Sequence, residues 1–477
     1  REKAEEAADA NKLANNLELA TLAEAHLILH PFMSSLAIGY DALEATTNVE
    51  DITEISENQD ILRSLKNDEL PALRLLAPGQ AKKARDYEVR SSRELGWLGH
   101  FMKKSTRLES FGMYGYGADT LNNCSEESVN RFFGDLSNLE ELYIDCELIN
   151  YGYGLDFLND GMVELESIPS LTTCKGIRTL TLNGLHLSIN SCALLSVAFP
   201  RMAALLELHL SWNSFNDYCT RILAQGLSEC KQILSLDLSR NRISDDGLDV
   251  LIQGLPASVD ALNLEDNEIT LARQLPLLRF KELDLCVNTL CLGGPGVIAA
   301  SLANPECRLE ELQLTRCNIG SEGAAIIAPS LRGNQKLTRL SLDLNDVTEE
   351  GWNAFSSILC DTSSINATYN SNHTLRSLGF DQNMSPYTKM FLKLNHDQDK
   401  GRVAANKILQ VHRHLDMKSF FGRELDLLPR VVAWLDRFAE SRPDLKLSSI
   451  FEFVRAMPMK VTGEKRKTEG KKCKLSN

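Results

Sequence analysis

The amino-acid sequence predicts an α/β solenoid, a horseshoe with a parallel β-sheet on its concave face and helices on its convex face. Three observations lead to this fold class. An eleven-residue apolar pattern recurs along the middle of the chain, its copies begin about 28 residues apart, and the residues between copies show helical apolar spacing. A period of roughly 20–50 residues is typical of solenoid proteins.

The strands are predicted from the repeated pattern itself. It places apolar residues at its first, fourth, sixth and eleventh positions and Asn or Cys at its ninth, which is the LxxLxLxxNxL pattern of the leucine-rich repeat. Six clear copies begin at residues 205, 233, 259, 280, 309 and 337, and weaker copies begin at 108, 139 and 177. Because one repeat cannot bury its leucines alone, stacked neighbours are expected to share a continuous core.

Each strand is expected to lead through a turn into a helix. After Asn241 the sequence ISDDGLDVLIQGL places Leu248, Leu251 and Leu255 at helical spacing. The Asn at the ninth position is expected to hydrogen-bond backbone groups that the turn leaves unpaired, a structural role and not a catalytic one.

Two spacings depart from the period. The 21 residues between the copies at 259 and 280 predict a short turn in place of a helix. The 38 residues between 139 and 177 contain an insertion at 151–161, which either carries function or packs as an irregular loop.

Residues 360–380, CDTSSINATYNSNHTLRSLGF, are interpreted as a degenerate last repeat that begins at Ile365. In this register Thr368 and Asn370 occupy leucine positions and His373 occupies the Asn position. Loss of the core pattern is expected in a terminal repeat, which leads into a cap. Two Asn-X-Thr sequons, which matter only in a secreted chain, lie at Asn366 and Asn372.

Charge and pattern predict four regions along the chain. They are a mostly helical acidic region at 1–95, a solenoid of about nine or ten repeats at 96–380, a helical cap at 381–459 and a basic disordered tail at 460–477. Residues 1–70 hold 15 acidic and 5 basic side chains, whereas the tail holds 7 basic and 2 acidic ones. The tail could also act as a nuclear-import or polyanion-binding patch.

Composition excludes several classes of function. A net charge of −14 disfavours nucleic-acid binding, which requires a basic surface. No apolar stretch is long enough for a transmembrane helix. The 12 cysteines form no CxxC pair, so reduced thiols in a cytoplasmic or nuclear protein are the simplest account. The chain begins at Arg1, so a targeting segment could precede it.

Motifs for catalysis are missing from the sequence. It contains no P-loop, no GxSxG, no HExxH and no dinucleotide-binding glycine motif, and its nine histidines do not cluster at metal-ligand spacing. We therefore expect a protein that is not an enzyme, with no cofactor and no metal site.

The outward-facing positions of the predicted sheet are the candidate binding residues. Carboxylates dominate there, and carboxylates on a curved sheet would attract a basic partner, although a solvated surface would carry them too. Trp and Arg, which are frequent at interface hot spots, recur just after the strands. The candidate residues are Tyr143, Glu207, His209, Trp212, Asp237, Arg240, Glu265, Asp284, Gln313 and Arg316.

The 28-residue pattern resembles the ribonuclease-inhibitor-like subfamily of leucine-rich repeat proteins. The stretches at 95–111, 359–379, 406–412 and 420–438 are similar to the large family of such proteins that is expanded in diatoms. This resemblance implies the solenoid fold and a cytosolic or nuclear adaptor role, without a defined activity.

We therefore predict a non-enzymatic interaction scaffold that binds a protein with basic elements on its acidic concave face. The alternative is a GTPase-activating protein similar to the Ran activators, which share this repeat. Those activators typically end in an acidic tail, whereas this chain ends in a basic one. A third class, actin-capping proteins resembling tropomodulin, would need an amphipathic arm, for which only residues 10–30 are available.

Overall fold

The computed structural model describes residues 39–76, 86–114, 121, 123–134, 136, 139–145, 176–273, 277, 279–380 and 384–412. The chain divides into two compact units, Arg1–Gly294 and Pro295–Asn477, here called the first and the second unit. The helix predicted near the N-terminus, the insertion at 151–161 and the basic tail lie outside the described residues.

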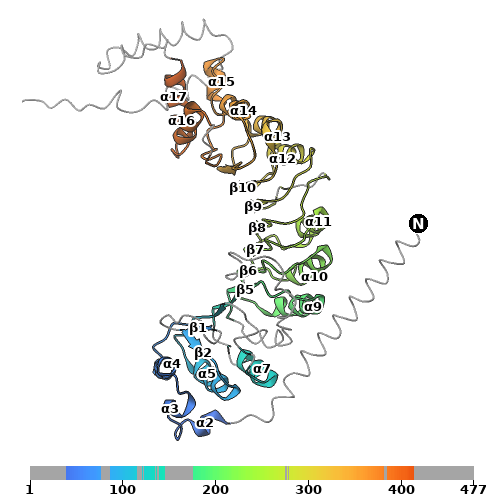
Figure 1. Cartoon of the computed structure of the whole chain (residues 1–477). Helices are drawn as coiled ribbons and strands as arrows, with labels where there is room; N and C mark the ends of the chain where they lie inside the picture. Colours follow the sequence, from blue (N-terminus) through green and yellow to red (C-terminus); the bar gives the residue numbers. More distant parts are fainter. Residues whose placement is uncertain are drawn as a thin grey trace, which may run out of the picture. The chain divides into compact units, whose positions relative to one another are not determined.

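The first unit is built on a parallel sheet, which confirms the predicted α/β repeat (Figure 1). The strands follow the spatial order β9-β8-β7-β6-β5-β4-β3-β1-β2. They are β1 (Ala72–Leu76), β2 (Asp86–Glu88), β3 (Ser110–Tyr114), β4 (Glu141–Asp145), β5 (Thr179–Asn183), β6 (Glu207–His209), β7 (Ser235–Asp237), β8 (Ala261–Asn263) and β9 (Glu282–Asp284).

Helices connect most of these strands. In Figure 1 helices α9, α10 and α11 lie on one side of strands β5 to β8, as the repeat pattern predicts. Between β8 and β9 the described residues form no helix, in agreement with the short spacing. The helices of this unit are α2 (Tyr40–Leu43), α3 (Val49–Ile52), α4 (Ser56–Lys66), α5 (Ser92–Lys104), α7 (Glu126–Gly134), α9 (Ile189–Ala198), a 3-10 turn (Phe199–Arg201), α10 (Asp217–Leu227) and α11 (Asp245–Gly254).

The repeat leucines form the core between sheet and helices. The middle residue of each short strand is buried: Leu208, Leu236, Leu262 and Leu283. Leu248 and Leu251 of α11 are fully buried as well, as the helical spacing predicts. Each fully buried leucine stabilises the fold by about 1.5–3 kcal/mol relative to an exposed one, so the shared core holds the repeats together.

The N-terminal end of the sheet differs from the sequence-based expectation. Strands β1 and β2 lie within residues 1–95, where mostly helices are predicted. Strand β1 shows the first half of the leucine-rich pattern, with Leu70, Leu73 and Leu75 buried at its first, fourth and sixth positions. The ninth position holds Pro78 in place of Asn, and this stretch was not counted among the copies. The edge strand β2 is covered by the Asn58 side chain, whose Nδ2 donates to Glu88 O at 2.8 Å and whose Oδ1 accepts from Glu88 N at 3.2 Å. Pairing of this kind protects an edge strand from association with other chains.

The second unit continues the same repeat and ends in helices. Strands β10 (Glu311–Gln313) and β11 (Arg339–Ser341) pair in parallel, and Ser377 adds one further parallel bridge to Arg339. The helices are α12 (Gly294–Ala303), α13 (Gly320–Ile327), a 3-10 turn (Ala328–Leu331), α14 (Glu349–Leu359), α15 (Ile365–Tyr369), α16 (Pro386–Leu394) and α17 (Lys400–Val411). The last three belong to the region between the final repeat and residue 412.

The register predicted for the last repeat is wrong. Thr368 and Asn370 do not occupy strand positions, because residues 365–369 form helix α15 and Asn370 caps its C-terminus. The strand-like residues come later, where Leu375 and Leu378 are fully buried. Asn372 is buried too, and its Nδ2 donates to Leu331 O at 2.7 Å and to Asn334 O at 3.0 Å, so this sequon is closed to glycosylation in the folded chain.

Candidate functional site

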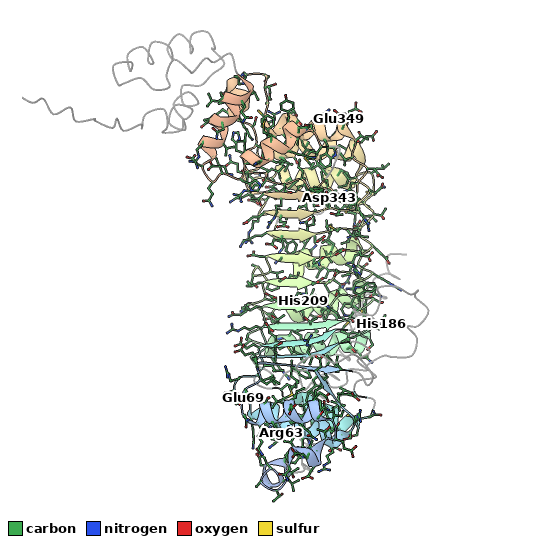
Figure 2. All side chains as sticks on the ribbon, turned by 60° about the vertical axis from the view of Figure 1, so that its left-hand side comes forward. Arg63, Glu69, His186, His209, Asp343 and Glu349 are labelled. Atoms are coloured by element: carbon green, nitrogen blue, oxygen red, sulfur yellow. The ribbon has the colours of Figure 1, made fainter. Side chains whose placement is uncertain are left out.

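Alternation along the short strands determines which side chains face outward. In β6 the middle residue Leu208 is buried, while Glu207 is exposed and His209 is half-buried. Figure 2 shows His209 in front of the strands, on the side opposite the helices. We call the outward side of strands β6 to β9 the acidic sheet face. Its charged and titratable members are Glu207, His209, Asp237, Glu265, Glu282 and Asp284.

His209 lies between two carboxylates of the acidic sheet face. Its Nδ1 is 3.7 Å from Asp237 Oδ2, and its Nε2 is 3.8 Å from Glu207 Oε2. Contact with Asp237 raises the pKa of His209 above its usual value, against the opposing effect of burial. Burial acts to raise the pKa of Asp237, but contacts with His209 and the Ser239 N–H hold it below its usual value. Protonation of His209 therefore neutralises part of the negative charge on this face.

Glu265 and Asp284 form a second acidic pair on the same face. Burial raises the pKa of the Glu265 carboxyl, repulsion by the nearby Asp284 carboxylate adds to this, and the Arg240 guanidinium opposes it. Asp284 of β9 lies in register with Asn263 of β8, two residues before Glu265. The two carboxylates therefore add to the negative charge of this part of the face, which Arg240 compensates in part.

The turn after each strand presents a further side chain beside the face. Trp212 and Arg240 occupy equivalent positions in consecutive repeats, and the Arg240 guanidinium lies 4.7 Å from the centroid of the Trp212 ring. This distance is within the range of a cation–π contact. The sequence predicted both residues as binding residues, and the structure brings them together.

These turn residues adopt the left-handed backbone conformation. Values of φ between 53° and 60° occur at Trp212, Arg240, Asp266, Val287, Arg316 and Leu344. At four of them the backbone N–H donates to the next repeat. Trp212 N donates to Ser239 O at 3.1 Å and Arg240 N to Glu265 O at 2.7 Å, and Asp266 and Arg316 make the equivalent bond. Left-handed geometry costs an ordinary residue roughly 1–2 kcal/mol, and the bond between repeats offsets it.

The Asn ladder confirms the structural role predicted for the ninth position. Asn241 donates from Nδ2 to Leu210 O, Leu238 O and Ser239 O at 2.9–3.1 Å. Its Oδ1 accepts from Asn213 N and Phe215 N at 3.1 and 2.9 Å. The other members repeat this pattern in full or in part: Asn213, Asn267, Asn288 and, in the second unit, Asn345.

The remaining candidate residues lie outside strands β6 to β9. Tyr143 belongs to β4, opposite Thr181 of β5, but its side chain lies outside the described part of the structure. Gln313 and Arg316 belong to the second unit. There Gln313 Nε2 donates to Glu311 Oε1 at 2.6 Å, while Arg316 is exposed. Arg339 Nε also pairs with Glu311 at 2.6 Å, so this strand surface carries both signs of charge.

Sequence reasoning missed a second set of contacts between repeats, formed by the first residues of helices α10 and α11, Asp217 and Asp245. Asp245 accepts hydrogen bonds from the backbone of Thr270, Leu271 and Ala272 and from the Thr270 hydroxyl, all at 2.8–2.9 Å. Asp217 binds Ser244 and Gly247 of the following repeat in the same way. A carboxylate four positions after the ladder Asn was the available signal for this contact.

One group of potential metal ligands lies in the first unit, at Asp41, Glu44 and His100. The Lys104 ammonium already contacts this group, at 2.7 Å from Asp41 Oδ1 and 2.6 Å from Glu44 Oε2. His100 Nε2 is 3.0 Å from Glu44 Oε2. The lysine supplies the positive charge that a metal would otherwise bring, so we interpret the group as an ion-pair network joining α2 to α5.

Nine cysteines of the described residues are free thiols, and most are buried. Buried thiols without disulfides are compatible with the reducing compartment that the sequence suggested. Among the same residues, no helix combines the length and the apolar character needed to cross a membrane.

The repeats match a known family model, and the chain has relatives among known proteins. The family model described as "Leucine Rich repeat" matches residues 230–251, 307–328 and 333–356. The chain is 29% identical to the ribonuclease inhibitor of Mus musculus over 223 residues, 45% of this chain and 41% of the relative. It is also 29% identical to the Sus scrofa ribonuclease inhibitor, over 39% of this chain and 36% of the relative.

Another relative is a much larger protein, of which the match covers only a small part. The human "NACHT, LRR and PYD domains-containing protein 5" is 31% identical over 37% of this chain and 16% of its own length. The chain thus spans less than half the length of each of these relatives. An internalin from Listeria monocytogenes covers 70% of this chain and 98% of its own, with a TM-score of 0.31 and 14% identity. LegL7 from Legionella pneumophila covers 72% of this chain and 98% of its own, with a TM-score of 0.40 and 17% identity.

Proposed function

We propose that this chain, a leucine-rich repeat protein resembling the ribonuclease inhibitors, is a non-enzymatic scaffold that binds a basic segment of a partner protein. The binding surface is the acidic sheet face, with Trp212 and Arg240 at its side. The proposal rests mainly on the strand register, which aligns His209 with Asp237 of β7 and, across Asn263 of β8, with Asp284 of β9, so that carboxylates gather on one face. Curated relatives named as ribonuclease inhibitors support a protein-binding role. We place the scaffold in the cytoplasm or nucleus, in keeping with its free buried thiols.

Removal of two charges from the acidic sheet face tests this function. Asp237 and Asp284 each use one oxygen to accept a backbone N–H two residues later, at 2.9 and 2.8 Å. Asp237→Asn with Asp284→Asn removes both charges and leaves an acceptor for each bond. We expect the double variant to bind a fluorescent oligolysine peptide about tenfold more weakly than wild type, with a shallower dependence on salt.

A matched control carries the same charge change elsewhere. Glu229→Gln with Glu268→Gln removes two exposed carboxylates that lie outside the strands. This control is expected to bind the peptide as wild type does. Equal weakening in both double variants would mean that net charge alone attracts the peptide, and the assignment to this face would fail. Cell-extract proteins retained by wild type and the control, but lost by the Asp237/Asp284 variant, would then identify partners.

The same binding is expected to depend on pH through His209. Its pKa is raised above the usual value of 6.5, so the imidazole is largely protonated below that pKa and opposes a basic ligand. Peptide affinity should therefore rise as pH increases through the His209 pKa. His209→Gln should bind with a flat profile over that interval, measured by fluorescence anisotropy at constant ionic strength. A profile unchanged by this substitution would show that His209 does not face the ligand.

A further inference from the structure

Arg376 is a half-buried arginine of the second unit. Its backbone N–H donates to Thr338 O at 2.7 Å, which places the residue beside the start of β11. Its Nε is buried and has no hydrogen-bond partner, and among the described residues its guanidinium forms no ion pair. A buried guanidinium donor without an acceptor costs free energy, so the site calls for a group that can accept hydrogen bonds.

A second cation, Lys400, follows a loop that is hydrogen-bonded to the segment of Arg376. Lys400 is the first residue of α17, and its Nζ donates to the backbone carbonyls of Asn395 and Asp397 at 3.1 and 3.2 Å. The Asn395 side chain in turn donates to Leu375 O at 2.6 Å, directly before Arg376 in the chain. The loop that carries Lys400 is thus fastened to the segment that carries Arg376. Burial, and then repulsion by the Arg376 charge, lower the pKa of Lys400.

Two acids of the described residues, Asp397 and Asp399, stand close to Lys400 in the chain and pair with Arg402. Both oxygens of Asp397 accept hydrogen bonds from the Arg402 guanidinium at 2.6 Å. Asp399 accepts the Arg402 backbone N–H at 3.1 Å and so caps α17. Lys400 is also affected by the Asp397 charge, but after burial and Arg376. Two like charges in a partly buried place repel each other unless an anion lies between them.

We propose that Arg376 and Lys400 form a binding site for an oxyanion group, either a carboxylate or a phosphate. A planar guanidinium can donate two parallel hydrogen bonds to such a group, and an ammonium adds a point charge. The third N–H of Lys400 remains for the ligand, because the two carbonyls use the others. This site is separate from the acidic sheet face and takes ligands of the opposite charge.

A titration with inorganic phosphate tests the site in the full chain. At constant ionic strength, phosphate should raise the thermal unfolding midpoint of wild type in a saturable manner, as expected for a ligand that binds only the folded state. Arg376→Gln should weaken the apparent phosphate affinity by about tenfold or more. Lys400→Gln provides an independent second variant. Lys393→Gln, an exposed lysine on α16, is the matched control and should respond as wild type does.

The source of the oxyanion is distinguished by a second set of ligands. Acetate tests whether a carboxylate alone binds the site. A short peptide with a free C-terminus, compared with the same peptide amidated, tests whether the carboxylate of a peptide end binds there. No saturable response to any of these ligands would overturn the proposal. That result would fit a water molecule joining the buried Nε to Asn395 Oδ1, a second buried atom without a partner. An equal response of wild type, Arg376→Gln and Lys400→Gln would overturn it as well.

Discussion

Replacement of Asn241 by alanine is expected to lower the free energy of unfolding of the first unit by about 4 kcal/mol. The side chain is buried and takes part in five hydrogen bonds to backbone groups, three as donor and two as acceptor. Alanine leaves those groups without partners in a place closed to water, and each buried group left unpaired costs about 1–3 kcal/mol. Partial relaxation of the turn keeps the total below the sum.

Asn241→Asp separates the two roles of the amide. A carboxylate keeps the acceptor but faces three carbonyl oxygens without a donor, so we expect a loss at least as large as for alanine. Protonation restores one donor, and the difference between Asp and wild type should shrink as pH falls. Asn190→Ala, an exposed residue of α9, should change stability by less than about 0.5 kcal/mol.

Hydrogen exchange with denaturant titration measures both effects. Because repeat arrays do not always unfold as one unit, local protection is more informative than a single transition. In Asn241→Ala, amides near Asn213 and Phe215 should exchange faster than in wild type, since their acceptor is gone. Unchanged protection there, together with an unchanged transition, would refute the structural role of the ladder.

Replacement of Lys407 by alanine is expected to destabilise the second unit by about 4 kcal/mol, through lost packing and lost hydrogen bonds. Lys407 lies fully buried on α17. Its Nζ contacts Leu359 O at 2.7 Å, Asn372 O at 2.8 Å and His373 Nδ1 at 3.2 Å. His373 Nε2 must donate to Tyr369 O at 2.9 Å, so Nδ1 is the acceptor and all three ammonium donors are used.

A methionine at the same position separates packing from hydrogen bonding. Lys407→Met retains most of the volume, and we expect a smaller loss of about 2 kcal/mol. The exposed Lys393→Ala on α16 should be nearly neutral. Thermal unfolding, with hydrogen exchange in α14 and α17, measures each loss. Equal stability of Lys407→Ala and wild type would show that the buried ammonium does not hold the terminal helices.

The pH dependence of the second unit provides a further check on Lys407. Burial lowers the pKa of Lys407 to about 7, compared with 10.5 for a free lysine. Between these values the unfolded chain binds more protons than the folded chain, so stability should increase from about pH 7 to about pH 10. Lys407→Met should lack this increase, because the titrating group is absent.

The repeat core was predictable because its information is local and periodic. Leu208, Leu236 and Leu262 each stand in one copy of the same pattern, and Asn241 marks the turn that follows. The sheet face could also be anticipated, since alternation alone places Glu207 and Asp237 outward. Whether that face binds a partner stays a prediction, because a solvated surface would show the same residues.

Some missed features left a weak local signal, and others left none. Strand β1 pairs with β3 and with β2. It shows only the first half of the repeat motif, at Leu70, Leu73 and Leu75, while β2 shows none of it. The last register was misplaced because helix α15 is inserted before Leu375. No local pattern marks Lys407, because its partners lie 34 to 48 positions earlier in the chain.

The left-handed position in the turn after the strand affects how the binding specificity of the repeats can evolve. Trp, Arg, Asp, Val and Leu all occupy it with nearly the same φ, although glycine would adopt this conformation at less cost. At four of the six positions the backbone bond to the next repeat fixes the turn without regard to the side chain. Single substitutions there can therefore alter one contact with a partner while the rest of the surface stays in place. New recognition can be acquired stepwise, one repeat at a time, with no intermediate that fails to fold.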